Sequence, residues 1–140
     1  MSSLLGSSAG LASVVGAIVI ALGFGLYRRA TDGRARRVQG ELAAGPWAGR
    51  LGERATFVQF SSPICAPCRS TERVLSGIAD ETPGVAHLDV DVSERLDLAD
   101  EFDIRRTPTV LVLDAAGLVR QRLVGPPTRA QALTALAALG

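Results

Sequence analysis

The strongest constraint on this chain lies at Thr56–Leu75, where a strand pattern, two cysteines and a helical pattern follow one another. The residues of Thr56–Phe60 alternate between apolar and polar and include Phe and Val, which predicts a strand. Two serines and a proline end that pattern before Cys65 and Cys68, the only cysteines of the chain. Apolar residues then recur at helical spacing as far as Ile78. Both cysteines are therefore expected in the first turn of a helix that follows a strand.

That position favours thiol chemistry. The free N–H groups and the positive dipole end of a helix N-terminus favour a thiolate over a thiol, and the thiolate is the nucleophile of disulfide exchange. Cysteines three residues apart on a helix face each other, so one can attack a disulfide and the other can resolve the mixed disulfide. Pro67, between them, is tolerated because the first turn needs no N–H there.

A structural disulfide or half of a metal site are the alternatives for this pair. A zinc or iron–sulfur site needs further soft ligands, and the chain has one histidine, His87, and no third cysteine. The ring that a Cys-x-x-Cys disulfide closes is also too short to stabilise a fold much. We therefore expect a redox-active pair, with no metal and no cofactor.

The charge balance argues against nucleic-acid binding, because 15 basic residues, all arginine, face 14 acidic ones. The apolar residues are unevenly distributed: Leu11–Tyr27 is almost wholly apolar, close to the roughly 20 residues that span a bilayer. A signal peptide would have basic residues before this stretch, whereas here Arg28 and Arg29 follow it. A core helix this apolar would need a larger protein around it. We predict a transmembrane anchor over residues 1–27, in contact with lipid over residues 4–27.

The arginines also predict the orientation of the chain. Five of them lie between Arg28 and Arg37, and the positive-inside rule then keeps the C-terminal side in the cytoplasm. Residues 28–50 are expected to form an arginine-rich juxtamembrane linker, in which part of Ala35–Ala44 could add a first strand or a short helix. A domain over residues 51–140 follows.

The pattern of that domain is β-α-β-α-β-β-α, which indicates an α/β fold. The cysteine-bearing helix is expected to end near Glu81. The elements expected after it are an alternating strand at Val85–Val92, a helix from a capping box at Asp91 to about Asp103, a buried strand at Thr109–Leu113 and its antiparallel partner at Leu118–Val124. A capping box at Thr128 is expected to open a last helix, whose inward residues would be Leu133, Leu136, Ala137 and Leu139.

Three segments make Leu51–Gly140 resemble the thioredoxin superfamily. FVQFSSPICAPCR is similar to its strand and active-site helix, RRTPTVLVLD to the segment with its cis-proline, and GLVRQRLVG to its closing hairpin. The resemblance implies a mixed central sheet flanked by helices. It also implies that Cys65 is the nucleophile, that Cys68 resolves the mixed disulfide, and that a substrate chain docks at Thr107 and a cis Pro108.

The chain departs from the family at several positions of the site. Gln59 stands where thioredoxins bury an aspartate that relays the proton of the resolving cysteine, and glutamine cannot ionise. His87 stands where they usually have lysine, and it could serve in such a relay or simply be solvated. Ile64 replaces the usual tryptophan and Ala66 the usual glycine of the redox dipeptide.

These observations together predict a membrane-tethered thiol–disulfide oxidoreductase that reduces protein disulfides. Its partners would be disulfide-containing proteins, an electron donor and the lipid bilayer, with the catalytic domain facing the cytoplasm. One alternative is disulfide exchange outside the cytoplasm, for example during haem-protein maturation. Another is a tethered thioredoxin-like module that binds peptides without turnover.

Overall fold

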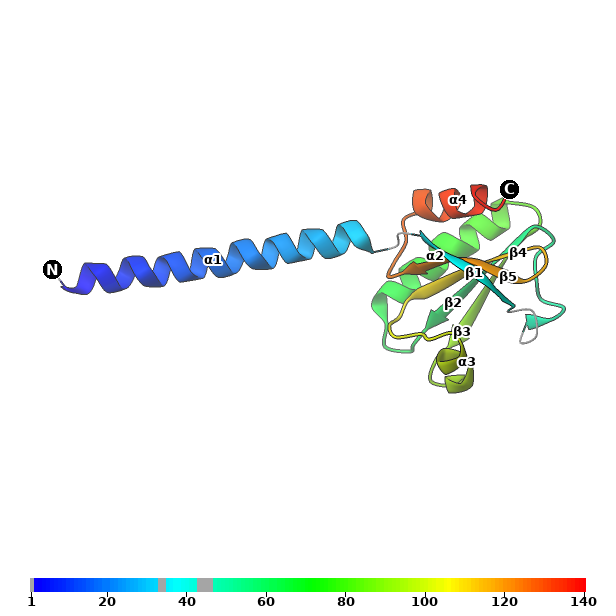
Figure 1. The fold of residues 1–140 in the computed structure, drawn as a ribbon, viewed down its shortest axis with the longest axis horizontal. Coiled ribbons are helices and arrows are strands. Elements are labelled where there is room, and N and C mark those ends of the chain that lie inside the picture. The colour runs from blue at the N-terminus through cyan, green and yellow to red at the C-terminus, as the bar shows by residue number, and fades with distance from the viewer. Residues whose placement is uncertain (1, 33–34, 43–46) are drawn as a thin grey trace. The chain divides into compact units, whose positions relative to one another are not determined.

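The computed structural model describes residues 2–32, 35–42 and 47–140, which form two compact units, Met1–Thr31 and Asp32–Gly140 (Figure 1). The first unit is the helix α1 (Ser2–Thr31). The second contains, in chain order, β1 (Ala35–Leu42), β2 (Ala55–Ser61), α2 (Ala66–Glu81), β3 (Val85–Asp91), α3 (Leu96–Glu101), β4 (Thr109–Asp114), β5 (Leu118–Val124) and α4 (Arg129–Ala137).

Helix α1 carries the apolar stretch of the sequence. Its segment Gly10–Thr31 is long and apolar enough to cross a membrane, and none of its most apolar part is buried against protein. Large side chains such as Ile20 and Leu26 are exposed. A helix with apolar residues on every side has no polar face to present to water.

The strands form one mixed sheet in the order β1-β5-β4-β2-β3. Strands β2 and β3 run parallel, while the β2–β4, β4–β5 and β1–β5 pairs are antiparallel. The predicted α/β fold is confirmed. Of the two possibilities for part of Ala35–Ala44, the structure shows a strand at Ala35–Leu42, which pairs Ala35 with Leu123 and Leu42 with Leu118, while residues 43 and 44 lie outside the described residues. Without it, β5 would be an unpaired edge of the sheet, so the folded unit begins before the expected linker ends.

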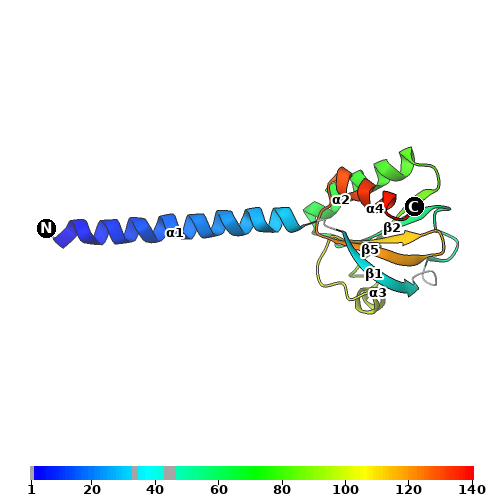
Figure 2. The same ribbon diagram turned by 45° about the horizontal axis from the view of Figure 1, so that its top comes forward.

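Alternation along the two central strands divides the core into two layers. On the β2 strand, Phe57 packs under α2 and α4, whereas Val58 and Phe60 pack on the opposite side with α3. Every residue of β2 is buried. Figure 2 shows the same division, with α2 and α4 covering one face of the sheet and α3 the other. The active-site helix is therefore fixed against a sheet that is covered on both faces.

An aromatic cluster fills the α3 side of the sheet. The ring centroids of Trp47 and Phe102 lie 5.4 Å apart, and the Phe60 centroid lies 6.4 Å from that of Trp47 in an edge-on arrangement. Only 2% of Trp47 is exposed. This tryptophan, the only one of the chain, is thus a packing residue and an internal reporter of folding.

Two details of the helices differ from the sequence-based expectations. Helix α3 begins at Leu96 and has no side-chain cap, because the Asp91 carboxylate instead accepts hydrogen bonds from the backbone N–H and the hydroxyl of Ser93. The capping box at Thr128 is confirmed in α4. The buried residues of α4 are Ala132 and Ala135. Of the four residues expected inward, Leu136 and Leu139 are half-buried and pack against the core, whereas Leu133 and Ala137 are exposed. Small alanines let α4 approach the sheet closely.

The glycine at position 52 is required by a close backbone contact. A Cβ atom there would lie 2.3 Å from the Ala55 carbonyl oxygen and 2.6 Å from that of Gly84. We predict that Gly52→Ala lowers the free energy of unfolding by about 3 kcal/mol, the cost of overpacking a rigid site. Denaturant unfolding of the full chain in detergent, followed by Trp47 fluorescence, measures it.

The matched control is Gly77→Ala in α2, where the only atom that a Cβ would meet lies 4.0 Å away, at the end of the Arg129 side chain. Alanine is the better helix former, so this variant should gain up to about 1 kcal/mol. Equal effects of the two substitutions would contradict the close contact at Gly52.

Candidate functional site

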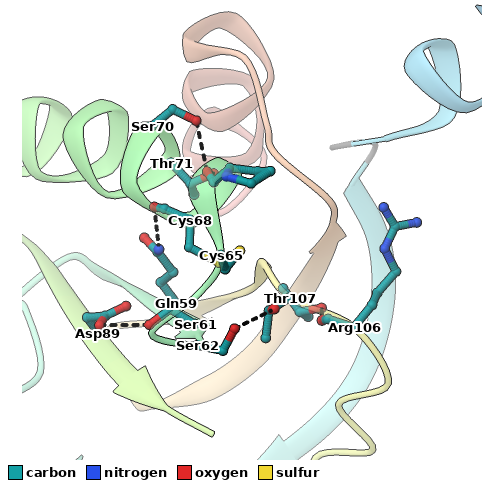
Figure 3. The surroundings of a disulfide bond; sticks show 12 residues. Gln59, Ser61, Ser62, Cys65, Cys68, Ser70, Thr71, Asp89, Arg106 and Thr107 are labelled. Carbon is teal, nitrogen blue, oxygen red and sulfur yellow. Dashed lines mark hydrogen bonds between the residues drawn. A yellow bond between two sulfur atoms is a disulfide. The ribbon is translucent and has the colours of Figure 1, made fainter.

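The two cysteines form a disulfide at the N-terminus of α2, with their Cα atoms 5.3 Å apart (Figure 3). Cys65 is the N-cap residue, and the following Pro67 occupies the first turn, as the sequence predicts. The two sulfur-bearing residues differ in accessibility: Cys65 is partly exposed, whereas only 3% of Cys68 is exposed. A bulky disulfide arriving from outside can therefore reach Cys65 and not Cys68.

The surface beside Cys65 is apolar. Ile64 is 97% exposed, and Pro63, Ala66 and Pro67 are exposed as well. An isoleucine held this far into water offers an apolar contact to whatever approaches Cys65.

The loop before β4 lies next to the disulfide. The Thr107–Pro108 peptide bond is cis, as the sequence predicts. The Ser62 hydroxyl, from the loop that leads to Cys65, lies 3.5 Å from the Thr107 hydroxyl (Figure 3). The Pro108 carbonyl oxygen accepts a hydrogen bond from the Gly125 N–H at 2.9 Å, which ties the loop to the end of β5. The structure thus brings Thr107 and Pro108 together with the cysteines.

Asp32, the first residue of the sheet-bearing unit, is held at the same loop. Its carboxylate forms an ion pair with Arg106 at 3.2 Å, and its carbonyl oxygen accepts a hydrogen bond from the Gln131 side chain at 3.3 Å. A Cβ atom on Gly125 would lie 2.8 Å from the Asp32 carboxyl carbon. Asp32, which follows α1 in the chain, is therefore bound to Arg106, the residue before Thr107.

Gln59 connects His87 to the active-site helix. Its amide nitrogen donates a hydrogen bond to the Cys68 carbonyl oxygen at 2.9 Å, and its side-chain oxygen lies 3.1 Å from Nε2 of His87. An amide oxygen can only accept, so Nε2 of His87 carries a hydrogen and donates it. Both groups that the sequence singles out for a proton relay are adjacent, but their hydrogen-bond chain ends on the Cys68 carbonyl and not on its sulfur.

The protonation of His87 is set mainly by its surroundings. Burial lowers its pKa from the ordinary value of 6.5, and the nearby carboxylates of Asp89 and Glu72 partly offset that shift. Desolvation disfavours the charged imidazolium, so the surroundings of His87 favour its neutral form.

A polar pocket of about 210 Å³ opens beside the cysteines, between the end of β2 and the start of α2. The ionisable side chains that line it are Arg69, Glu72, Asp89 and Asp91. The Asp89 carboxylate accepts a hydrogen bond from the Ser61 hydroxyl at 2.9 Å (Figure 3). Asp89 is on the edge strand and is exposed overall, yet burial of its carboxyl group raises the pKa, with the Ser61 bond opposing and Glu72 adding to the shift.

Sequence reasoning missed Ser61 and Asp89. The signal lay in the alternation of β3, which places His87, Asp89 and Asp91 on one face, together with the parallel pairing of Gln59 with Asp89. Among the described residues, no three His, Cys, Asp or Glu side chains are grouped to hold a metal ion.

Comparison with known proteins relates this site to one family. A family model described as Thioredoxin matches residues 47–138. A putative thioredoxin H10 of Arabidopsis thaliana is 38% identical over 71 residues, which are 51% of this chain and 46% of that protein. Thioredoxin-2 of Pyricularia oryzae is 32% identical over 77 residues, 55% of this chain and 45% of that protein. The chain thus spans about half the length of these relatives.

Solved structures show the same fold. The crystal structure of thioredoxin NaTrxh from Nicotiana alata matches with a TM-score of 0.54 and 27% identity, over 61% of this chain and 73% of that one. A mutant thioredoxin from Halobacterium salinarum has a TM-score of 0.59 at 22% identity, over 73% of this chain and 87% of that one.

The environment of His87 generates a prediction for pH dependence. As the only histidine of the chain, it should give one titrating imidazole signal by NMR, with a pKa below 6.5. Replacing Asp89 by Asn removes an attraction for the imidazolium and should lower the pKa further.

The lowered pKa of His87 also predicts how the stability of the fold changes with pH. Because the folded-state pKa is depressed, the unfolded chain binds the extra proton more readily. His87 should therefore contribute full stability above about pH 6.5, the unfolded pKa, and lose that contribution as the pH falls below it. A titration midpoint above 6.5 would contradict the environment described here.

Proposed function

This chain belongs to the thioredoxin family, and on that premise we propose that it is a thiol–disulfide oxidoreductase that reduces protein disulfides through Cys65 and Cys68. The observation that carries the proposal is the unequal exposure of the two cysteines at the start of α2. Only Cys65 can meet a protein disulfide. Cys68, buried one helical turn away and already within disulfide distance, is placed to resolve what Cys65 forms.

The reaction runs in two exchanges. The Cys65 thiolate attacks one sulfur of the substrate disulfide, that S–S bond breaks, and the other substrate sulfur leaves as a thiolate. The Cys68 thiolate then attacks the Cys65 sulfur and displaces the second substrate sulfur. Two electrons have passed from the dithiol to the substrate, and the Cys65–Cys68 disulfide remains. A reductant must return two electrons and two protons before the next cycle.

The substrate chain is proposed to dock between Ile64 and Thr107. Ile64 offers an exposed apolar contact on one side of Cys65, and the Thr107–Pro108 loop lies on the other, in reach of Ser62. That loop is held in place by the hydrogen bond from the Gly125 N–H to the Pro108 carbonyl oxygen and by the ion pair between Arg106 and Asp32. An extended segment around the substrate cysteine suits such a site, because the contacts hold the disulfide in line with Cys65.

Membrane attachment through α1 is the second part of the proposal. Its support is the apolar segment Gly10–Thr31 and the run of arginines that follows at Arg28–Arg37. The positive-inside rule then leaves the sheet-bearing unit in the cytoplasm. That compartment keeps thiols reduced, which agrees with a reductase.

The mechanism predicts a trapped intermediate. In Cys68→Ser the attacking thiolate and the Thr107–Pro108 loop are retained, but the resolving sulfur is gone, so the mixed disulfide between Cys65 and substrate should persist. Non-reducing gels of membranes should show adducts that collapse with reductant, and their identification names the substrates.

The control for trapping is the double variant Cys65→Ser/Cys68→Ser, which cannot form the bond. If the folded, membrane-bound Cys68→Ser chain traps no more than this control, the oxidoreductase proposal fails and a peptide-binding module takes its place. Adducts that consist of secreted or surface proteins would instead favour exchange outside the cytoplasm.

The orientation is tested separately with C-terminal fusions. Five arginines behind the apolar segment should keep the C-terminus inside, so an alkaline phosphatase fusion should be inactive and a fluorescent-protein fusion bright. Strong phosphatase activity would reverse the orientation. Replacing Arg28 and Arg29 by Gln in the phosphatase fusion should raise its activity if these charges set the topology.

A further inference from the structure

The resolving step needs a proton acceptor for the Cys68 thiol. Cys68 attacks as a thiolate, so its thiol proton must first leave. Only 3% of Cys68 is exposed, and the residue packed against it, Gln59, cannot ionise. A proton acceptor within reach of Cys68 would therefore speed resolution.

The pocket that contains Cys68 offers few acceptors. Arg69 has no lone pair to offer, and the Asp91 carboxylate already accepts two hydrogen bonds from Ser93, which lower its pKa. Glu72 lines the same pocket from α2 and, like Asp89, is exposed. Among the described residues lining this pocket, Asp89 is the carboxylate that a buried side chain, Ser61, holds in position.

His87 does not take this role in the observed arrangement. Its Nε2 hydrogen points to Gln59, and Gln59 in turn donates to the Cys68 carbonyl. A proton would have to pass through an amide to travel along this chain.

We propose that Asp89 accepts the Cys68 proton in the resolving step and returns it when the disulfide is reduced again. Ser61 is its positioning residue, since its hydroxyl donates a hydrogen bond to Oδ2 of Asp89, while Oδ1 accepts none from the described residues. The pocket of about 210 Å³ has room for several water molecules, each of about 30 Å³, to carry the proton between Sγ and Oδ1. Because Asp89 is exposed on its other side, it can release the proton to solvent.

The electrostatic surroundings of Asp89 suit a base that binds a proton and releases it. Glu72 from α2 and Asp91 from β3 favour the protonated carboxyl, whereas His87 and the Ser61 hydrogen bond favour the carboxylate. Burial adds to the first group, so the pKa is raised from its ordinary value. A raised pKa brings a carboxylate closer to the pKa of a thiol, which makes proton transfer less uphill.

This inference rests on the proposed oxidoreductase activity, and the test separates the two. The reduced full chain in detergent, freed of reductant, is mixed with one equivalent of dithiobis(nitrobenzoic acid), and thionitrobenzoate release is followed by stopped flow. Attack by Cys65 releases the first thionitrobenzoate. Attack by Cys68 on the Cys65 mixed disulfide releases the second and leaves the Cys65–Cys68 disulfide. Cys68→Ser must lose the second phase, and if it does not, the proposed function itself fails.

Asp89→Asn keeps the hydrogen bond from Ser61 but cannot take a proton. The second phase should slow by about 100-fold, the lower end of what general bases contribute, while the first phase stays unchanged.

The dependence of the second-phase rate on pH should also change. In the unaltered chain the second phase rises as Asp89 ionises, whereas in Asp89→Asn it should follow the hydroxide concentration. Asp89→Glu should recover part of the rate.

The matched control is Asp80→Asn, which removes the same charge from the exposed end of α2 and should leave both phases intact. Three results would overturn the proposal: a second phase in Asp89→Asn as fast as in the unaltered chain, a slowing of both phases in equal proportion, or a second phase that depends on His87, tested as His87→Asn, and not on Asp89.

Discussion

The fold depends on the burial of β2 along its whole length. Its odd-numbered residues face α2 and its even-numbered ones face α3, so a shift by one residue would move both cores to the wrong side. The strand ends at Ser61 and α2 begins at Ala66. This short connection fixes Cys65 and Cys68 at the N-terminus of α2. The same register turns Gln59 toward α2, where it meets the Cys68 carbonyl.

Local sequence patterns were sufficient to predict those elements whose structure depends on one segment alone. The strand and helix around Cys65 and the capping box at Thr128 are confirmed. The cis bond at Pro108, which only the family resemblance implied, is confirmed as well. The start of α3 was wrong because the Asp91 side chain has two possible uses, and its bond to Ser93 excludes the cap. The exposure of Leu133 depends on how closely α4 lies on the sheet, which no local pattern contains.

The candidate site was predictable only in part, for a similar reason. Its cysteines and Pro108 belong to short motifs, but the polar pocket beside the cysteines depends on how β2 and β3 pair. That pairing brings Ser61 to Asp89 across the strands, 28 residues apart in sequence. In place of one buried carboxylate at position 59, the site has a neutral amide in the interior and a carboxylate at the rim, so its ionisable group stays in contact with water.

The attachment of Asp32 has a mechanical consequence. The chain leaves α1 at Thr31, and its next residue is paired with Arg106, beside the Thr107–Pro108 loop, before β1 joins β5 at Ala35. A pull on the chain before Asp32 would thus reach Arg106, and Gly125 at the end of β5, before the covered centre of the sheet. The segment that follows α1 and the loop next to Cys65 are therefore mechanically linked through one ion pair.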